Sequence, residues 1–454
     1  MWSLFQANAR PLCRVKPRAT RDVAAVLEIL VANSCPFAVL GGGTSPFAGA
    51  SNIDGGVTID LGSLNSIRIP EDNPAVVEVG GGVVWAELYR FLDPLNLSSA
   101  GTRNSLTGVV GSILGGGISF FSQRHGWSCD NVVSFEVVLA NSSVVQASQH
   151  HNAELFWALR GGGNNFGIVT SLTLDTFPQA PSWYTFQRWP MRALESIFYR
   201  LEQLTIDMPP LIQMVATTLG WSPHLQEFTI SERLVATSPP ELPRTQPIRN
   251  AGANSAHTAA LEEYVYVKTT LEMAQKMDRM NAEGFFNYFG SVTVRSQAEI
   301  NMEIANIFFD EVEHIKSARG VQVYIVYNPV TVPAMEQMRK RGGNVLGLNP
   351  QGGPLTIVNI NLHWATEPDT PRMRTFMRRM IARIEDRARR DGVHHPYVFL
   401  NHCFEEQLPL ASYGEGNVAR LHALASLVDP GGVFQVLQPG HHKLQPTHPR
   451  LGMR

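Results

Sequence analysis

The sequence predicts a mixed α+β protein with more than one domain. Its 454 residues exceed the usual size of one domain. In residues 1–177, short β-branched runs end in glycine clusters, which is typical of short strands joined by tight turns. Beyond a proline-containing stretch at 177–181 the glycine clusters thin out, and strand patterns alternate with longer helical ones. With 44% hydrophobic and 17% charged residues, a disordered or collagen-like chain is excluded.

Several strands and helices are expected in the first part of the chain. Strands are predicted at residues 36–40, 57–61, 76–80, 135–139 and 144–145. The apolar spacing predicts a helix from Thr20 to Ala32, with Thr20 as its N-cap and Asp22 in its first turn. Two further helices are predicted at residues 83–92 and 154–159.

The second part is richer in helices. We expect them at residues 195–207, 255–281, 335–341, 371–391 and 417–427. Residues 239–253 are rich in proline and polar residues, which predicts an exposed loop.

Charge and cysteine content exclude several function classes. A formal net charge of −2 gives no basic surface for nucleic acid or a membrane. The four cysteines are scattered without a C-x-x-C pair, so we predict no disulfide framework and no metal site. The longest apolar stretch, residues 109–121, is too short to cross a bilayer. Since no signal peptide is visible, we expect the cytoplasm, or secretion if the amino terminus is trimmed. The oligomeric state is left open.

Three glycine clusters carry the first functional signal. They are Gly41-Gly42-Gly43-Thr44-Ser45 after a predicted strand, residues 101–117, and residues 159–169. Consecutive glycines let backbone N–H groups converge on an anion, although a single cluster is more often a plain turn. None matches the phosphate loop or the G-x-G-x-x-G opening of a dinucleotide-binding unit. Together they indicate a long, flat ligand with a diphosphate, contacted by backbone in several places.

The order of these and other motifs resembles a known family. The glycine run at 41–45 is followed by the motifs at 59–65, 101–121, 126–132 and 160–169, and the later part carries those at 340–348, 395–401 and 429–435. This series is similar to the berberine bridge enzyme-like flavoproteins, whose FAD-binding domain is of the p-cresol-methylhydroxylase type, within the vanillyl-alcohol oxidase superfamily. The resemblance covers essentially the whole chain and is closest to fungal members.

The resemblance implies a fold and a set of cofactor contacts. It implies two α/β subdomains around one FAD at residues 8–178, a substrate domain at 179–395 with an antiparallel sheet flanked by helices, and a segment at 396–445 that returns to the FAD domain. By position it implies pyrophosphate contacts along the first loop, ribityl and ring contacts in the second cluster, an adenine-side residue, and an asparagine facing the flavin. These residues are Gly41, Gly42, Gly43, Thr44 and Ser45; Gly108, Gly111, Ser112 and Gly117; Val169; and Asn401.

A first departure from the family pattern concerns the attachment of FAD. Many relatives hold FAD covalently through a histidine after the glycine run and a cysteine in the second cluster. Here Thr44 and the segment Arg103-Asn104-Ser105 stand in those regions. A threonine hydroxyl is too weak a nucleophile to attack a flavin without activation. We therefore expect non-covalent FAD.

A second departure concerns proton transfer. Relatives often carry Y-x-N-Y at the flavin, whereas this chain has Phe399-Leu400-Asn401-His402. Phenylalanine cannot move a proton, and histidine can. His402 is therefore the leading catalytic candidate, the alternative being that Phe399 is a core aromatic and His402 a satisfied polar residue. The resemblance adds Asn344 and Tyr327 as cavity-lining catalytic candidates. Weaker candidates are His125, Glu405 and Glu406.

These observations leave three function classes. The first is an FAD-dependent oxidoreductase that oxidises or oxidatively cyclises a small secondary-metabolite intermediate, with O2 as acceptor. The second is a redox-neutral isomerase or cyclase, pericyclic chemistry included, in which FAD is structural or absent. The third is a non-catalytic binding protein. The choice of a small-molecule secondary metabolite rests on the resemblance, because a fold does not fix a function.

Overall fold

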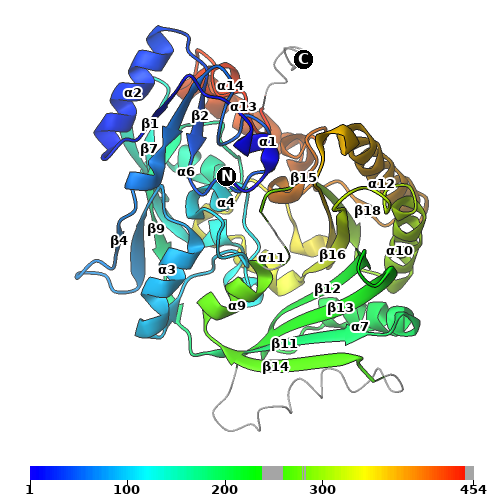
Figure 1. The fold of residues 1–454 in the computed structure, drawn as a ribbon. Coiled ribbons are helices and arrows are strands. Elements are labelled where there is room, and N and C mark those ends of the chain that lie inside the picture. The colour runs from blue at the N-terminus through cyan, green and yellow to red at the C-terminus, as the bar shows by residue number, and fades with distance from the viewer. Residues whose placement is uncertain (238–258, 279, 281–282, 445–454) are drawn as a thin grey trace.

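Three larger sheets and one short strand pair organise the molecule. The structure is a computed structural model that describes residues 1–237, 259–278, 280 and 283–444. Figure 1 shows the strands of the amino-terminal part on one side and the strands of a large sheet on the other. In the described part of the chain, no helix is long and apolar enough to cross a membrane.

The first sheet is parallel and small, with strand order β1-β3-β2. Helix α2 covers it and buries Val23, Leu27 and Leu30, whose spacing places them on one helix face. Its strand β2 leads directly into the glycine run at 41–45. The elements are α1 (Leu4–Ala7), β1 (Cys13–Val15), α2 (Thr20–Ala32), β2 (Phe37–Leu40) and β3 (Val57–Asp60).

The second sheet is antiparallel, in the order β4-β5-β9-β7-β8. Strands β6 and β10 form a separate short antiparallel pair. The elements are β4 (Ile67–Arg68), β5 (Val76–Gly80), α3 (Trp85–Leu92), β6 (Leu97–Ser98), α4 (Val109–Leu114), α5 (Ser122–His125), β7 (Val132–Val138), β8 (Val144–Ser148), α6 (Ala153–Leu159), β9 (Ile168–Asp175) and β10 (Phe177–Pro178).

The third sheet is large and antiparallel, with strand order β14-β11-β13-β12-β16-β17-β15-β18. Its strands and the helices of this part are β11 (Ser182–Trp189), α7 (Leu194–Ile206), β12 (Ile212–Ser222), β13 (Glu227–Ala236), β14 (Glu262–Lys268), α9 (Thr270–Asp278), β15 (Phe286–Arg295), α10 (Ala298–Val312), β16 (Gln322–Val330), α11 (Val332–Gln337), β17 (Leu355–Trp364), α12 (Thr370–Arg390) and β18 (His394–His395). Helices α13 (Glu415–Val428) and α14 (Val433–Val436) follow.

The two faces of the large sheet have different roles. Side chains alternate between the faces of a strand. On β16, Val323, Ile325 and Tyr327 belong to the core formed with α7, α10 and α12, which Figure 1 shows along the outer side of the sheet. The alternate residues Tyr324 and Val326 line a cavity on the opposite face. The helices thus seal one face, and the other face is free to form a binding site.

The expected fold class is confirmed: an α+β chain with a large antiparallel sheet flanked by helices. Helices α2, α6, α7, α12 and α13, and strands β2, β3, β5, β7 and β8, lie at or within a few residues of their expected positions. The loop expected at 239–253 lies outside the described residues. The domain limits at 8–178, 179–395 and 396–445 stay a prediction.

Two local expectations are wrong, and one helix is absent from the prediction. The described part of the helix expected at 255–281 holds strand β14 and only then helix α9, because residues 264–267 are aromatic or β-branched and the strand pairs with β11. Thr20 is the first residue of α2 rather than its cap; the residue before the helix is Ala19, whose N–H donates to the Asp22 carboxylate at 3.0 Å. Helix α10 was not expected.

Candidate functional site

One cavity of about 500 Å³ lies where the glycine clusters face the large sheet. Its lining comes from the loop after β2, from helix α4 and its flanks, from the start of β9, from strands β15, β16 and β17, and from the carboxy-terminal segment. The structure brings to it all residues predicted to contact a cofactor: Gly41, Gly42, Gly43, Thr44, Ser45, Gly108, Gly111, Ser112, Gly117, Val169 and Asn401. Their contact with FAD stays a prediction.

The first two glycine clusters touch each other through backbone. A Cβ atom placed on Gly42 would lie 2.3 Å from the amide nitrogen of Gly108, so no larger residue fits there. Gly43 has φ +67°, a left-handed conformation that glycine adopts without strain. This packing leaves the backbone of the loop bare toward the cavity, as a diphosphate site built from N–H groups requires.

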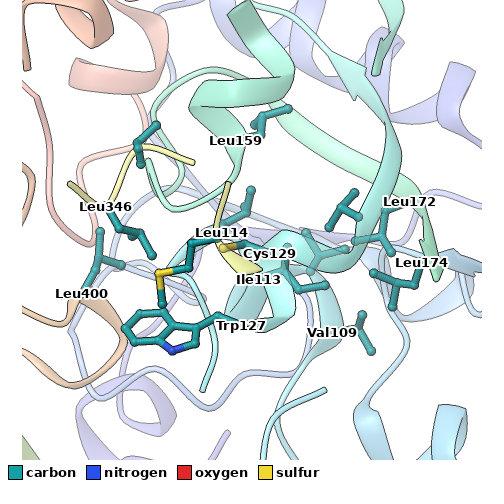
Figure 2. Packing of buried hydrophobic residues seen from close by; sticks show 14 of the residues in the cluster. Val109, Ile113, Leu114, Trp127, Cys129, Leu159, Leu172, Leu174, Leu346 and Leu400 are labelled. Atoms are coloured by element: carbon teal, nitrogen blue, oxygen red, sulfur yellow. The ribbon is translucent and has the colours of Figure 1, made fainter. Parts of the chain in front are cut away.

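Helix α4 is fixed by apolar packing on its far side. Val109, Ile113 and Leu114 belong to a buried cluster that includes residues of β9 and Trp127. Figure 2 shows Leu346, Leu400 and Trp127 on one side of this group, and Leu172 and Leu174 on the other. The other cluster members labelled there are Cys129 and Leu159. Because these contacts hold the helix in place, its glycine-containing face is held at the cavity.

Asn401 ties the carboxy-terminal segment to α4. Its Nδ2 donates to the carbonyl of Ser112 at 3.1 Å, and its Oδ1 accepts from the N–H of Gly117 at 3.3 Å. A Cβ on Gly115 would lie 2.6 Å from the Asn401 amide, so the close approach requires glycine there. Asn401 therefore serves as a clamp for the second glycine cluster and also lines the cavity.

His402 lines the same cavity from a short 3₁₀ turn at Leu400–His402. The rings of Phe289 and Phe399 pack against its imidazole, and Nδ1 lies 2.8 Å from Nδ2 of Asn359. Because the amide of Asn359 can present either its nitrogen or its oxygen to Nδ1, the tautomer of the imidazole decides which of the two side chains donates. Burial, helped by the nearby positive charge of Arg103, lowers the pKa of His402 to about 3. The imidazole is therefore neutral at pH 7.

The structure does not bring Tyr327 and Asn344 to the cavity. Tyr327 is fully buried on the helix face of the large sheet, where its ring packs on Phe198 and its hydroxyl donates to the carbonyl of Asn301 at 3.3 Å. Asn344 donates to the Asp130 carboxylate at 2.7 Å, away from the lining residues. Both side chains are engaged in structural contacts, so neither is kept as a catalytic candidate.

The weaker candidates also lie elsewhere. The ring of His125 stacks on Phe177 with centroids 3.8 Å apart, and burial lowers its pKa to about 4. Glu405 forms an ion pair with Arg374 and Glu406 one with Arg378, each at 2.6 Å. Since these three side chains have partners outside the cavity lining, they support stability rather than chemistry.

Several lining residues were not predicted from the sequence. Tyr324, Asn359 and Asn361 line the cavity from β16 and β17. Arg103 reaches it from the second glycine cluster and His441 from the carboxy-terminal segment. The Nδ1 atom of His441 and the Oδ1 atom of Asn359 are buried without a hydrogen-bond partner among the described residues. Unpaired buried polar atoms at a cavity wall indicate a missing ligand partner.

No group of three or more metal-ligating side chains occurs among the described residues. Among the residues that the structure describes, none of the four cysteines lines the cavity. The imidazoles of His402 and His441 do line it. The described wall thus combines glycine backbone, hydroxyls and amides with two neutral imidazoles, one guanidinium and one carboxylate.

Comparison with known proteins agrees with this arrangement. Residues 11–148 match the model of an FAD binding domain. The chain is 31% identical over 454 residues to the FAD-dependent monooxygenase tpcD of Cochliobolus heterostrophus, covering 98% of this chain and 86% of that protein. The chain belongs to the family of this FAD-dependent monooxygenase. It is an FAD-linked oxidoreductase by family, as the sequence motifs predicted.

Solved structures of two oxidases share the fold. The 6-hydroxy-D-nicotine oxidase of Arthrobacter nicotinovorans superposes with a TM-score of 0.78 at 18% identity, over 98% of this chain and 94% of that one. The glucooligosaccharide oxidase of Acremonium strictum, described with a 6-S-cysteinyl, 8α-N1-histidyl FAD, gives 0.73 at 21% identity, over 95% and 92%. The cavity wall described above fits an FAD, because bare glycine backbone and unpaired polar atoms meet there.

Proposed function

We propose that this protein binds FAD without a covalent link and oxidises, or oxidatively cyclises, a small secondary-metabolite intermediate with O2 as the acceptor. The observation that carries the proposal is the convergence of all predicted cofactor residues on the cavity that His402 also lines. The names of curated relatives such as the FAD-dependent monooxygenase tpcD support an oxidative reaction.

The glycine loop 41–45 would hold the diphosphate of FAD. The backbone at Gly108, Gly111 and Gly117 would follow the ribityl chain and the ring, and Asn401 would face the ring from the other side. When bound there, FAD supplies the acceptor for two electrons taken from a substrate C–H or O–H bond. Thr44 gives no nucleophile for a covalent link.

His402 would accept a hydrogen bond or a proton from the substrate. Its imidazole is neutral at pH 7, so it is available as an acceptor and is not a general acid. Asn359 holds the ring through Nδ1; with its amide turned so that Oδ1 accepts from Nδ1–H, Nε2 would carry no proton and would be the acceptor. The aromatic rings of Phe289 and Phe399 exclude water from this part of the wall.

The proposal is tested first without a substrate. The purified protein should carry flavin, and anaerobic reduction with dithionite followed by air-saturated buffer should restore the oxidised spectrum and yield hydrogen peroxide. Metabolite profiling of a deletion strain then identifies the substrate class. A protein whose reduced flavin is not reoxidised by air, or whose substrate is converted without oxygen uptake, would favour the redox-neutral isomerase or cyclase instead.

A further inference from the structure

Arg103 places a cation in the cavity wall that neither the cofactor contacts nor His402 explain. It extends from the second glycine cluster toward the large sheet, where its Nη2 donates to Oδ1 of Asn328 at 2.7 Å and its Nη1 lies 3.7 Å from the sulfur of Met214. A guanidinium has five N–H donors in a planar fork. The Arg103 side chain is partly exposed and lines the cavity, so its remaining N–H groups are available to a ligand there.

No carboxylate balances this charge among the residues that the structure describes. Arg103 takes part in none of the ion pairs among the described residues. The carboxylate of Asp278 contacts Ser105, which is close to Arg103 in the sequence. It accepts hydrogen bonds from the N–H of Ser105 at 2.9 Å and from the Ser105 hydroxyl. Glu283 is the one carboxylate among the described lining residues, and no ion pair joins it to Arg103.

A second cation makes the region more positive. The positive charge of Arg233 on β13 lies near that of Arg103, and the Nη1 atom of Arg233 donates to a neutral hydroxyl, that of Thr218, at 3.2 Å. Burial and Arg233 lower the pKa of Arg103 to about 10, which still leaves it charged at pH 7. Buried charges in proteins are normally paired. The missing partner must then come from a ligand.

The other residues that line the cavity indicate the polarity of the rest of that ligand. Tyr324, Asn359 and Asn361 supply neutral polar groups, and Met277, Phe289 and Val326 supply apolar surface. We propose that the substrate is a small, largely apolar molecule with a delocalised oxyanion, a carboxylate or the enolate of a diketone, which binds to Arg103 through two parallel N–H···O contacts. This inference rests on the proposed function, since it assigns the substrate class of the same site.

An anion on Arg103 would also act on His402. The positive charge of Arg103 contributes to the low pKa of His402. An oxyanion bound at the guanidinium would offset that charge and make the imidazole a better proton acceptor. Substrate charge and proton acceptance would thereby be coupled, so that the base is active when the correct anion is present.

The test uses the purified protein with its flavin and two probes, benzoate for the carboxylate and dimedone for the enolate. Binding is measured by titration calorimetry and by the change in the flavin spectrum, with neutral benzamide as the matched ligand. We expect at least one anion to bind and benzamide not to bind. Arg103→Met should weaken that anion by about 10- to 100-fold, as expected for losing a charge-assisted hydrogen bond pair, and Arg103→Lys should weaken it less.

Arg90→Met is the matched control, because Arg90 is an exposed arginine of α3, and it should leave anion binding unchanged. Flavin content and melting temperature show whether each variant is folded. The probe that binds tells a carboxylate from an enolate substrate. If neither anion binds the wild type, or if Arg103→Met binds it as well as the wild type does, the inference is overturned. Calorimetry measures anion binding even in a preparation that carries no flavin. Absence of flavin would contradict the proposed function, whereas the binding data would still test the anion site.

Discussion

At the residue scale, the lack of a strong nucleophile at Thr44 predicts that FAD is held without a covalent link. We expect acid precipitation of the purified protein to release all flavin into the supernatant, because a hydroxyl does not add to a flavin ring unaided. The measurement is flavin absorbance in supernatant and pellet. Flavin that remains with the pellet would contradict the prediction, and the two imidazoles at the cavity, His402 and His441, would be the first groups to examine by peptide mapping.

A second residue-scale prediction concerns His402. His402→Ala should lower kcat by about 10²- to 10⁴-fold, the range for losing a general acid or base, with flavin content intact. His402→Gln should rescue little, because an amide can hydrogen-bond but cannot take a proton. The control is His395→Gln, on strand β18 and outside the cavity lining, which should keep its activity. Near-normal turnover in both His402 variants would make this residue structural.

The residues of the large sheet show what sequence reasoning missed and why. Tyr324 and Tyr327 differ by an odd number of positions on one strand, so they must lie on opposite faces. The choice between them depends on which face carries the helices, and that is a property of the assembled sheet. On β17, Asn359 and Asn361 alternate with Val358 and Ile360, a pattern that the sequence contained and that favours one polar face.

At the element scale, we predict that flavin binding by the loop between β2 and β3 requires glycine backbone without side chains. Gly43→Val should remove most bound flavin while the fold persists, since its branches would enter the space next to Leu40 and the cavity. The matched control is Gly55→Val, because Gly55 has φ +65° with no atom near its Cβ position and lies outside the lining. Both variants carry the same backbone strain. Flavin content of Gly43→Val equal to that of Gly55→Val would show that the loop is only a turn.

Other elements show the limits of local pattern. Helix α2 was recognisable because its apolar residues repeat at helical spacing and face one core. Strand β14 has only four aromatic or β-branched residues between charged ones, too short a run to predict a strand, and its strand form depends on pairing with β11 across more than seventy positions of sequence. Likewise, the meeting of Gly42 with Gly108 follows from packing between two loops, which single-sequence spacing cannot give.

At the scale of the whole molecule, buried histidines predict loss of stability in acid. Burial lowers the pKa of His402 and His441 to about 3 and that of His125 and His363 to about 4, against about 6.5 in the unfolded chain. Below pH about 6.5 the unfolded state therefore binds more protons than the folded state. The free energy of unfolding should fall as pH drops from about 6.5 toward 4.

Thermal melts at several pH values check this sign. His363→Gln, if folded, should show a weaker decline of Tm in acid, because it removes one of the four groups. His150→Gln is the control, since His150 is exposed, and should decline like the wild type. A wild-type Tm that is flat or rises between neutral pH and pH about 5 would contradict the prediction.

The tie between Asn401 and the backbone of Ser112 has a consequence for how the protein is made. Its two partners are 289 positions apart in the chain. A ribosome therefore releases the glycine clusters long before it releases the segment that closes over them. If the first half folds in that interval, FAD would enter a pocket that Asn401 and His441 do not yet line. Supply of riboflavin to the cell should thus govern the yield of folded protein, with the last stretch of translation as the step at which the cofactor becomes trapped.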